Sequence, residues 1–326
     1  MILSYTMRLL FLCFATFFVL HAAGSLVVHF LSSAAVRVAE TMKPRRSARL
    51  LLAVRLAPVA LTLFLVLGFC VPSYLWLEPD IAGERAGMAC LLAGVLGAAV
   101  WAASLMRGLV SVVRTRTYLR RCGSDSCGTV ANAGTPRLLV VGQGNAVLAV
   151  AGVWHPRLLV SQDVMNALTE EQREAAFRHE AAHQAARDNL KHLLFLLSPD
   201  VVPFVRSLSK LEDGWTRFAD WAADDAAVDG DQSRALSLAS ALVGVAKLGV
   251  NASPSYLVSS LVKTDRDLAL RVDRLLREPA YAAKPLAPLV ALARNIALVI
   301  GGAVVTVLLW PESLGSVHRL LEKLLQ

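Results

Sequence analysis

The run His179-Glu180-Ala181-Ala182-His183 places two histidines four positions apart, with a glutamate directly after the first. If the run is helical, four residues advance about 400°, so both imidazoles lie on one face. Imidazoles at that spacing can take neighbouring corners of a zinc tetrahedron. Glu180, about 100° round the helix from His179, can reach a zinc-bound water without being a ligand. The spacing predicts a hydrolytic site with His179 and His183 as zinc ligands and Glu180 as general base.

A helix start is encoded ten residues before the histidines. Thr169-Glu170-Glu171-Gln172 has the form of a capping box, with Thr169 as N-cap and Gln172 reaching back to it. The small residues that follow predict a helix that packs closely against its neighbours. The alternative is a polar helix face on which the two histidines are only solvated.

A catalytic zinc ion usually has three protein ligands, so a third must come from elsewhere. The extended box with a third histidine is absent, because position 189 is Asn189. The later segment 217–227 offers Asp220 and Asp224, four residues apart on one face of a predicted helix. One of these two carboxylates can bind zinc while the other accepts a hydrogen bond from a ligand histidine. The alternative is a solvated acidic helix surface.

Three short β-branched runs, 137–141, 146–150 and 157–160, precede the zinc helix and predict a small antiparallel meander. A few strands followed by helices is the layout of a zincin, in which an edge strand beside the metal helix can pair with an extended substrate. The residues expected to form this edge are Ala146, Val147, Leu148, Ala149 and Val150. Further helices are expected at 215–230, 232–248 and 265–277.

The chain is too apolar for an ordinary soluble protein, with 56% hydrophobic and 18% charged residues. Four apolar runs are each long enough to cross a hydrocarbon core of about 30 Å. The expected spans are about 9–31, 53–77, 86–110 and 286–310. For the first run a cleaved signal peptide is the alternative, although the run is long and no clear cleavage site closes it. Segment 190–211, which prolines interrupt, is expected to be a helix, a membrane-touching segment, or both.

Arginines and lysines cluster after the first and the third apolar run, whereas acidic residues dominate after the second. Because positive loops stay in the cytoplasm, we expect the N-terminus outside and the zinc domain on the cytoplasmic side of the membrane. Much of the net charge of +8 is therefore membrane-flanking arginine, and no nucleic-acid partner is expected. The expected segments are three spans within 1–113, a basic linker at 114–136, the zinc domain at 137–285, the fourth span, and an amphipathic tail at 311–326.

Several segments together resemble the membrane metallopeptidases of the bacterial β-lactam sensor-transducer type and, more distantly, the HtpX-type and CAAX prenyl endopeptidases. The resemblance covers about residues 137–277. It lies in Gly144-Asn145-Ala146, Val153 to Val160, Leu168 to Gln172, Arg178 to His183, Arg187 to Leu190 and Leu270 to Leu275. It implies an α-helical multi-pass membrane protein with an inserted, mainly α, α+β zincin-like metallopeptidase domain.

The resemblance also implies one Zn²⁺ per chain and cleavage of a protein or peptide, such as a repressor, a membrane protein or the chain itself. Asp220 stands where these families usually have their glutamate ligand, so the resemblance implies that Asp220 binds zinc and that Asp224 orients a ligand histidine. Asp224, Asp188 and Arg271 are expected to support the site, with Arg271 either stabilising a transition state or forming a structural ion pair. No Ser-x-x-Lys box follows the fourth apolar run, so a β-lactam receptor role is not expected. The alternative function is a zinc-binding membrane signalling protein that does not cut.

Overall fold

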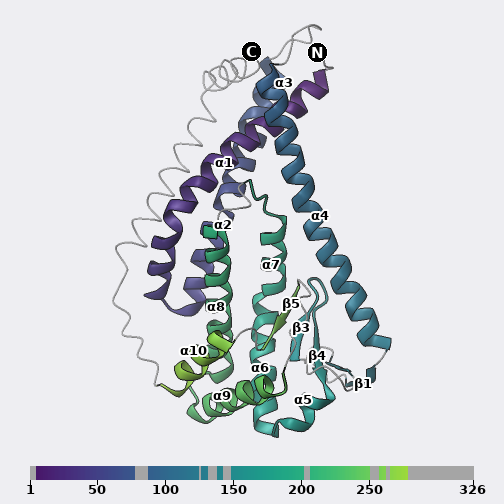
Figure 1. Cartoon of the computed structure of the whole chain (residues 1–326), viewed down its shortest axis with the longest axis vertical. Helices are drawn as coiled ribbons and strands as arrows, with labels where there is room; N and C mark the ends of the chain where they lie inside the picture. Colours follow the sequence, from purple (N-terminus) through teal and green to yellow (C-terminus); the bar gives the residue numbers. More distant parts are fainter. Residues whose placement is uncertain are drawn as a thin grey trace.

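The computed structural model describes residues 5–77, 87–124, 126–130, 138–141, 148–201, 206–249, 257–261 and 265–277. Within these ranges the chain is mainly helical, with one small sheet (Figure 1). The helices are α1 (Tyr5–Glu40), α2 (Pro44–Leu65), the π-helical turn η1 (Val66–Cys70), α3 (Val71–Leu77), α4 (Met88–Ser124), α5 (Gln162–Ala167), α6 (Glu170–Ala186), α7 (Asp188–Leu197), α8 (Arg206–Val228), α9 (Gln232–Lys247) and α10 (Asp265–Leu276). The strands are β1 (Ser126–Val130), β2 (Leu138–Val141), β3 (Leu148–Ala151), β4 (Arg157–Ser161) and β5 (Val258–Ser260).

Within the described residues, three helical segments are long and apolar enough to cross a membrane: Tyr5–Glu40, Pro44–Trp76 and Met88–Cys122, which contain 18-residue stretches with mean hydropathies of 2.1, 2.5 and 2.0. They overlap the first three predicted spans. The second runs through α2, η1 and α3. Pro72 lacks an N–H and its ring crowds the preceding turn, which accounts for the wider π turn there. The fourth predicted span, 286–310, and the tail, 311–326, lie outside the described residues.

Helices α7 and α8 stand between the long helices (Figure 1). α8 packs on α1 and α2, and α7 packs on α4. Burial of large side chains drives this packing, since one core joins Val28 and Leu51 of the long helices to Phe195, Trp215 and Phe218. Within segment 190–211, residues 190–197 and 206–211 are therefore helical and pack against the apolar helices.

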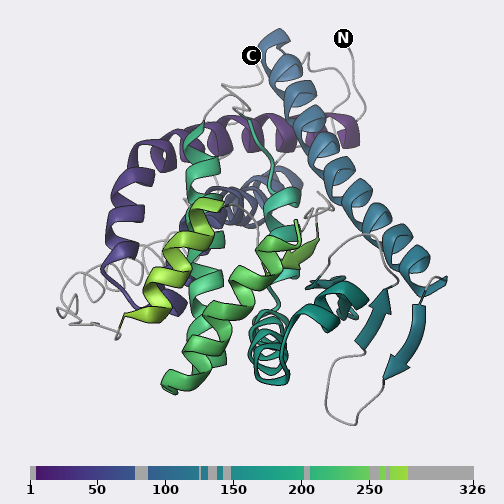
Figure 2. The ribbon, with the colours of Figure 1, turned by 60° about the horizontal axis from the view of Figure 1, so that its bottom comes forward.

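A second core lies at the other end of the molecule, where α6, α8 and α9 meet the sheet (Figure 2). Ala175 and Ala176 of α6 are buried there with Leu238 and Leu242 of α9. The small residues of α6 let the neighbouring helices approach closely, as the sequence predicts. This packing sets the position of the histidine-bearing helix.

The sheet has the strand order β1-β2-β4-β3-β5, so the predicted antiparallel meander is wrong. β3 and β4 form an antiparallel pair, but β2 pairs with β4 in parallel. β4 is buried along Leu158 to Ser161, and a strand buried in this way can occupy the centre of a sheet. The sequence predicts β2, β3 and β4 but neither β1, β5 nor this long-range order.

The predicted substrate-binding edge also needs correction. Ala146 and Val147 lie outside the described residues, and β3, which holds Leu148, Ala149 and Val150, has neighbours on both sides. β5 pairs antiparallel with β3, so that Val150 lies opposite Ser259. The run of β5 is too short and too polar to be recognised as a strand from the sequence.

The start of the predicted basic linker is helical. Residues 114–124 continue α4, because no glycine or proline interrupts the helix before Gly123. Residues 126–130 then form β1. The end of α4 and the sheet are therefore joined directly.

Candidate metal centre

Helix α6 carries the histidines and the glutamate on its buried side. Its predicted capping box is present: the backbone N–H of Gln172 donates to Oγ1 of Thr169, and the backbone N–H of Thr169 donates to Oε1 of Gln172. The exposed fractions of His179, Glu180 and His183 are 0%, 0% and 3%. Two merely solvated histidines do not fit this burial.

The donor atoms have the pairwise spacing of zinc ligands. Nε2 of His183 lies 3.1 Å from Nε2 of His179 and 3.4 Å from Oδ1 of Asp220 on α8. Two atoms bound at about 2.1 Å in a tetrahedron are about 3.4 Å apart. The donor types and these two distances fit zinc.

The side chains of His179, His183 and Asp220 are not in ligating geometry in this structure. Among the described residues, no group of three or more His, Cys, Asp or Glu side chains is placed to hold a metal ion as it stands. Nη2 of Arg271 lies 3.4 Å from Nε2 of His179. Because like charges repel, this guanidinium has to move back before a second cation binds at Nε2.

Each histidine has a carboxylate behind it. Nδ1 of His179 lies 2.8 Å from Oδ1 of Asp224, and Nδ1 of His183 lies 2.7 Å from Oδ2 of Asp188. A carboxylate at Nδ1 fixes the ring and leaves Nε2 as the metal-binding atom, as in many zinc sites. Asp188, for which the sequence supplied only a general supporting role, therefore contacts a histidine of the centre directly.

Arg271 of α10 holds Asp224. Its Nε donates to Oδ2 at 2.9 Å and its Nη2 to Oδ1 at 2.6 Å, while Nη1 donates to the carbonyl of Leu261. Both side chains are buried, at 5% and 0% exposure. This two-pronged geometry favours the structural ion pair of the two predicted roles for Arg271.

These charges push the pKa values of the two histidines apart. Burial and the guanidinium of Arg271 lower the pKa of His179 to about 4. Burial also acts to lower the pKa of His183, but hydrogen bonds to Asp188 and Asp220 outweigh it and raise that pKa to about 9. Burial would raise the pKa of Asp224, yet Arg271 and His179 hold it well below its usual range. Without metal at neutral pH, His179 is neutral and His183 is protonated.

Glu180 lies against strand β3. Its Oε2 accepts a hydrogen bond of 3.2 Å from the backbone N–H of Val150. The carboxylate therefore lies at the strand predicted to receive substrate, with which β5 also pairs. A general base and a backbone-pairing strand are thus within one hydrogen bond of each other.

Asn189 is a site residue that the sequence did not identify. Its side-chain amide donates to the carbonyls of Val150 and Gly152 at 3.0 and 2.9 Å, which ties the start of α7 to β3. Beside it lies a cleft of about 400 Å³ whose lining includes His183 and Trp154. The sequence signal for Asn189 was its place in the segment Arg187 to Leu190, which carries part of the resemblance to membrane metallopeptidases.

No family model matches this chain, and no curated protein matches it closely.

Proposed function

We propose that this chain is a membrane-embedded zinc metalloendopeptidase with a zincin-like domain, hydrolysing peptide bonds in regulated or signalling proteolysis. The observation that carries the proposal is the pair of buried histidines, each with a carboxylate at Nδ1 and with Nε2 atoms 3.1 Å apart. A helix surface without a metal function has no need for this arrangement. The resemblance to membrane metallopeptidases supports the same conclusion.

His179, His183 and Asp220 would hold the zinc ion. When bound, Zn²⁺ polarises a carbonyl and lowers the pKa of a bound water towards about 7. Asp188 and Asp224 keep the histidine rings oriented, and Arg271 keeps Asp224 in place. Asp220 is one methylene shorter than the glutamate of the resembled families. The 3.4 Å approach of its Oδ1 to His183 indicates that α8 lies close enough for the shorter side chain.

Glu180 is the proposed general base and acid. It accepts a proton from the attacking water and passes it to the leaving amine as the peptide bond breaks. Its complete burial keeps bulk water from competing for that proton. The N–H of Val150 fixes one carboxylate oxygen and leaves Oε1 as the atom for proton transfer.

A substrate would pair with β3 through its backbone. Because β5 occupies that side, with Val150 opposite Ser259, segment 257–261 has to leave before an external peptide pairs there. The substrate is a protein or peptide, for which a repressor, a membrane protein and the chain itself all remain candidates.

The test compares the purified, detergent-solubilised full chain with Glu180→Gln. Zinc content is measured together with cleavage of casein and of the chain itself. Glu174→Gln is the matched control, since Glu174 is an exposed residue of the same helix that pairs with Arg178. We expect zinc in all three proteins and cleavage by the parent and the control only. Absence of zinc from the parent would overturn the metal proposal.

A zinc-binding signalling protein that does not cut is the second candidate. The pairing of β5 with β3 and the aspartate at position 220 favour it. Zinc in the parent without cleavage of casein or of the chain would support this candidate over the peptidase.

We propose that the chain is inserted in a bacterial inner membrane, with its N-terminus outside and the metal centre on the cytoplasmic side. The three apolar helices support insertion, and the arginines after the first and third runs support this direction. Labelling of single cysteines placed at either end of α4 in intact cells tests the orientation. Labelling, from outside the cell, of a cysteine placed near Arg121 would reverse the proposed orientation.

A further inference from the structure

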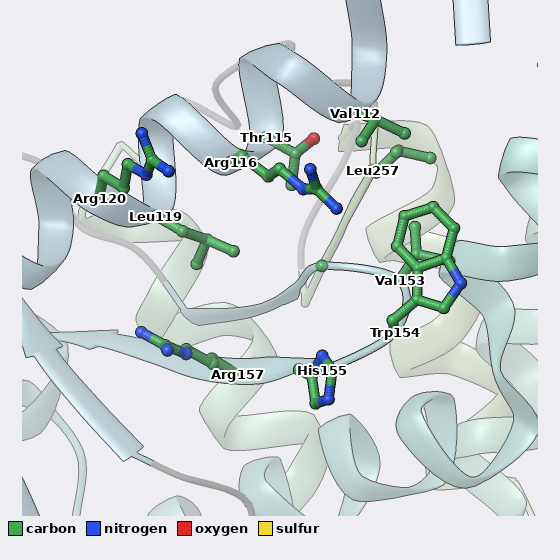
Figure 3. Close-up of a pocket in the computed structure, with 11 residues that line it drawn as sticks. Val112, Thr115, Arg116, Leu119, Arg120, Val153, Trp154, His155, Arg157 and Leu257 are labelled. Atoms are coloured by element: carbon green, nitrogen blue, oxygen red, sulfur yellow. The ribbon is translucent and has the colours of Figure 1, made fainter. Parts of the chain in front are cut away.

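A second cavity lies between the end of α4 and the turn that joins β3 to β4 (Figure 3). Its volume is about 560 Å³. It shares Gly152, Val153 and Trp154 with the cleft beside His183, but none of the metal-centre side chains lines it. It is therefore a separate space that adjoins the proposed active site.

The lining of this cavity is positively charged. Arg116 and Arg120 contribute charge from α4 and Arg157 contributes charge from the strand side, where the ring of His155 also lines the cavity (Figure 3). Among the described residues no Asp or Glu lines the cavity, and no ion pair is found for the three arginines. An anionic group in the cavity would supply the missing countercharge.

The cavity lies where the surface of α4 changes from apolar to basic. Leu105, Leu109 and Val113 are each more than half exposed, and Arg114 follows immediately. Such a change marks the level at which hydrocarbon gives way to headgroups. Trp154 is 61% exposed at this level, with the guanidinium of Arg116 5.8 Å from its ring centroid. An exposed tryptophan beside arginine is typical of a membrane interface.

The apolar and basic side chains of α4 form one stripe. Leu105, Leu109, Val113, Arg116 and Arg120 are three or four positions apart, so they fall within about 80° of the helix circumference. An acyl chain that lies along the first three residues brings its phosphate to the two arginines. A peptide side chain has no such use for the exposed apolar part of the stripe.

We propose that this cavity binds the phosphodiester headgroup of an anionic phospholipid, whose acyl chains lie along Leu105, Leu109 and Val113. The arginines pair with the phosphate, and Trp154 closes the cavity on the side that it shares with the cleft beside His183. The proposal depends on the membrane location of α4 but not on peptidase activity. A lipid bound in this way is a neighbour of the β3–β4 turn, and thus of the cleft beside His183.

The test is native mass spectrometry of the full chain after incubation in mild detergent with equal amounts of phosphatidylglycerol and phosphatidylcholine. The parent is expected to retain phosphatidylglycerol preferentially. In the double variant Arg116→Gln/Arg120→Gln, retention is expected to fall about tenfold or more. The matched control is Arg114→Gln/Arg121→Gln, which removes the same charge from the same helix but about 160–180° round from Leu105. The control should stay within about twofold of the parent.

Equal losses in the two double variants would overturn the proposal, because they would show general attraction to a basic helix. Equal retention of both lipids by the parent would also overturn it. Unchanged lipid retention in Arg116→Gln/Arg120→Gln would overturn the proposal as well. If that variant also loses binding of an acidic peptide, the cavity is assigned to peptide instead. If the double variant does not fold, retention of phosphatidylglycerol is measured in Arg157→Gln, which removes a charge from the strand side of the cavity. Zinc content measured on the same samples separates failure of this site from failure of the metal centre.

Discussion

The two histidines of the proposed metal centre differ in what holds them. His179 faces Asp224, which Arg271 grips with two hydrogen bonds in a fully buried cluster. His183 faces Asp188, whose other oxygen accepts from Lys191 at the start of α7. Substitutions on the second side leave no buried arginine without its partner, so they report on metal binding with less damage to the fold.

Asp188→Asn is expected to weaken zinc binding by about 10- to 100-fold, because an amide is a poorer acceptor for the Nδ1–H of His183. Competition with a chelator on the purified full chain measures the affinity. Asp273→Asn, which removes an exposed carboxylate of α10, is the control and should leave the affinity unchanged. An unaltered affinity in Asp188→Asn would show that His183 does not bind the metal.

Asp220→Glu restores the residue type of the resembled families but is expected to lower zinc affinity. Asp220 is 5% exposed and its carboxylate already reaches His183, so an extra methylene overpacks the site at a cost of about 1–3 kcal/mol. The same chelator competition compares this variant with the parent. Tighter binding by the glutamate variant would mean that α8 lies too far away for aspartate to ligate.

Zinc binding should release protons in a pH-dependent way. With a pKa of about 9, His183 holds a proton at pH 7 that zinc must displace, whereas His179, with a pKa of about 4, has none to lose. We expect His183 to release roughly one proton per zinc at pH 7, and a bound water with a pKa of about 7 to add up to one more. The total should therefore be nearly two at pH 8 and fall to about one at pH 10, where His183 has already lost its proton. Titration calorimetry in buffers of different protonation enthalpy counts these protons. A release that does not fall between pH 8 and pH 10 would contradict the assignment.

Local spacing predicts only part of this centre. His179, Glu180 and His183 follow from one helical turn, and Asp220 and Asp224 from another. The clamp of Arg271 on Asp224 and the bonds of Asn189 to β3 join residues far apart in the chain. Such contacts depend on how helices and sheet pack, which no spacing rule contains.

At the scale of elements, the pair α7 and α8 connects the two cores. α7 runs from the candidate metal centre to the apolar helices and α8 returns from them, and Arg55 of α2 donates to Ser198, Asp200 and Glu212 at their apolar end. Arg55 is 3% exposed, so its charge depends on these partners. The cluster fixes the turn between α7 and α8 against α2.

Arg55→Met is expected to destabilise the protein by about 2–4 kcal/mol, because it leaves two acidic groups beside an apolar surface. The loss is smaller than for a fully buried pair, since Asp200 and Glu212 are 29% and 38% exposed. Thermal unfolding in detergent measures it. Arg49→Met, one and a half turns earlier on the same helix and exposed, serves as control. Equal melting temperatures for the two variants would show that the cluster contributes nothing.

Periodicity predicts the helices more fully than the sheet. The long apolar runs, the capping box of α6 and the helices after it follow from local pattern. The parallel pairing of β2 with β4 and the addition of β5 do not, because strand order depends on contacts between distant segments. The predicted open edge at β3 was wrong for this reason.

For the whole molecule, the metal centre and the apolar helices do not form separable domains. Trp215 and Phe218 of α8 are buried against α1 and α2, and Gly108 of α4 lies against Leu197. A side chain at position 108 would meet Leu197 at 2.5 Å, so these helices are in close contact. The predicted boundary near residue 137 therefore separates segments of sequence rather than independent cores.

The isolated segment 137–285 is accordingly expected to aggregate, since it loses the cover over Leu208, Leu211, Trp215 and Phe218. Size-exclusion chromatography of this segment without detergent checks the expectation, with the full chain in detergent as reference. A monodisperse segment that binds zinc would show that the apolar helices are not needed for the centre to form.

The junction at Arg187 makes α6 and α7 behave as one bent rod. This single residue, with a left-handed φ of 56°, separates the helix of the two histidines from the helix that begins at Asp188. The ten residues of α7 span about 15 Å, from the carboxylate at His183 to Leu197 beside α4. A displacement of the Leu197 end by a shift of the surrounding helices is therefore carried mechanically to the ring of His183. If the three apolar helices cross a bilayer, as we propose, its thickness and lateral pressure act on the Leu197 end of α7 and so on the proposed metal centre, without any ligand entering it.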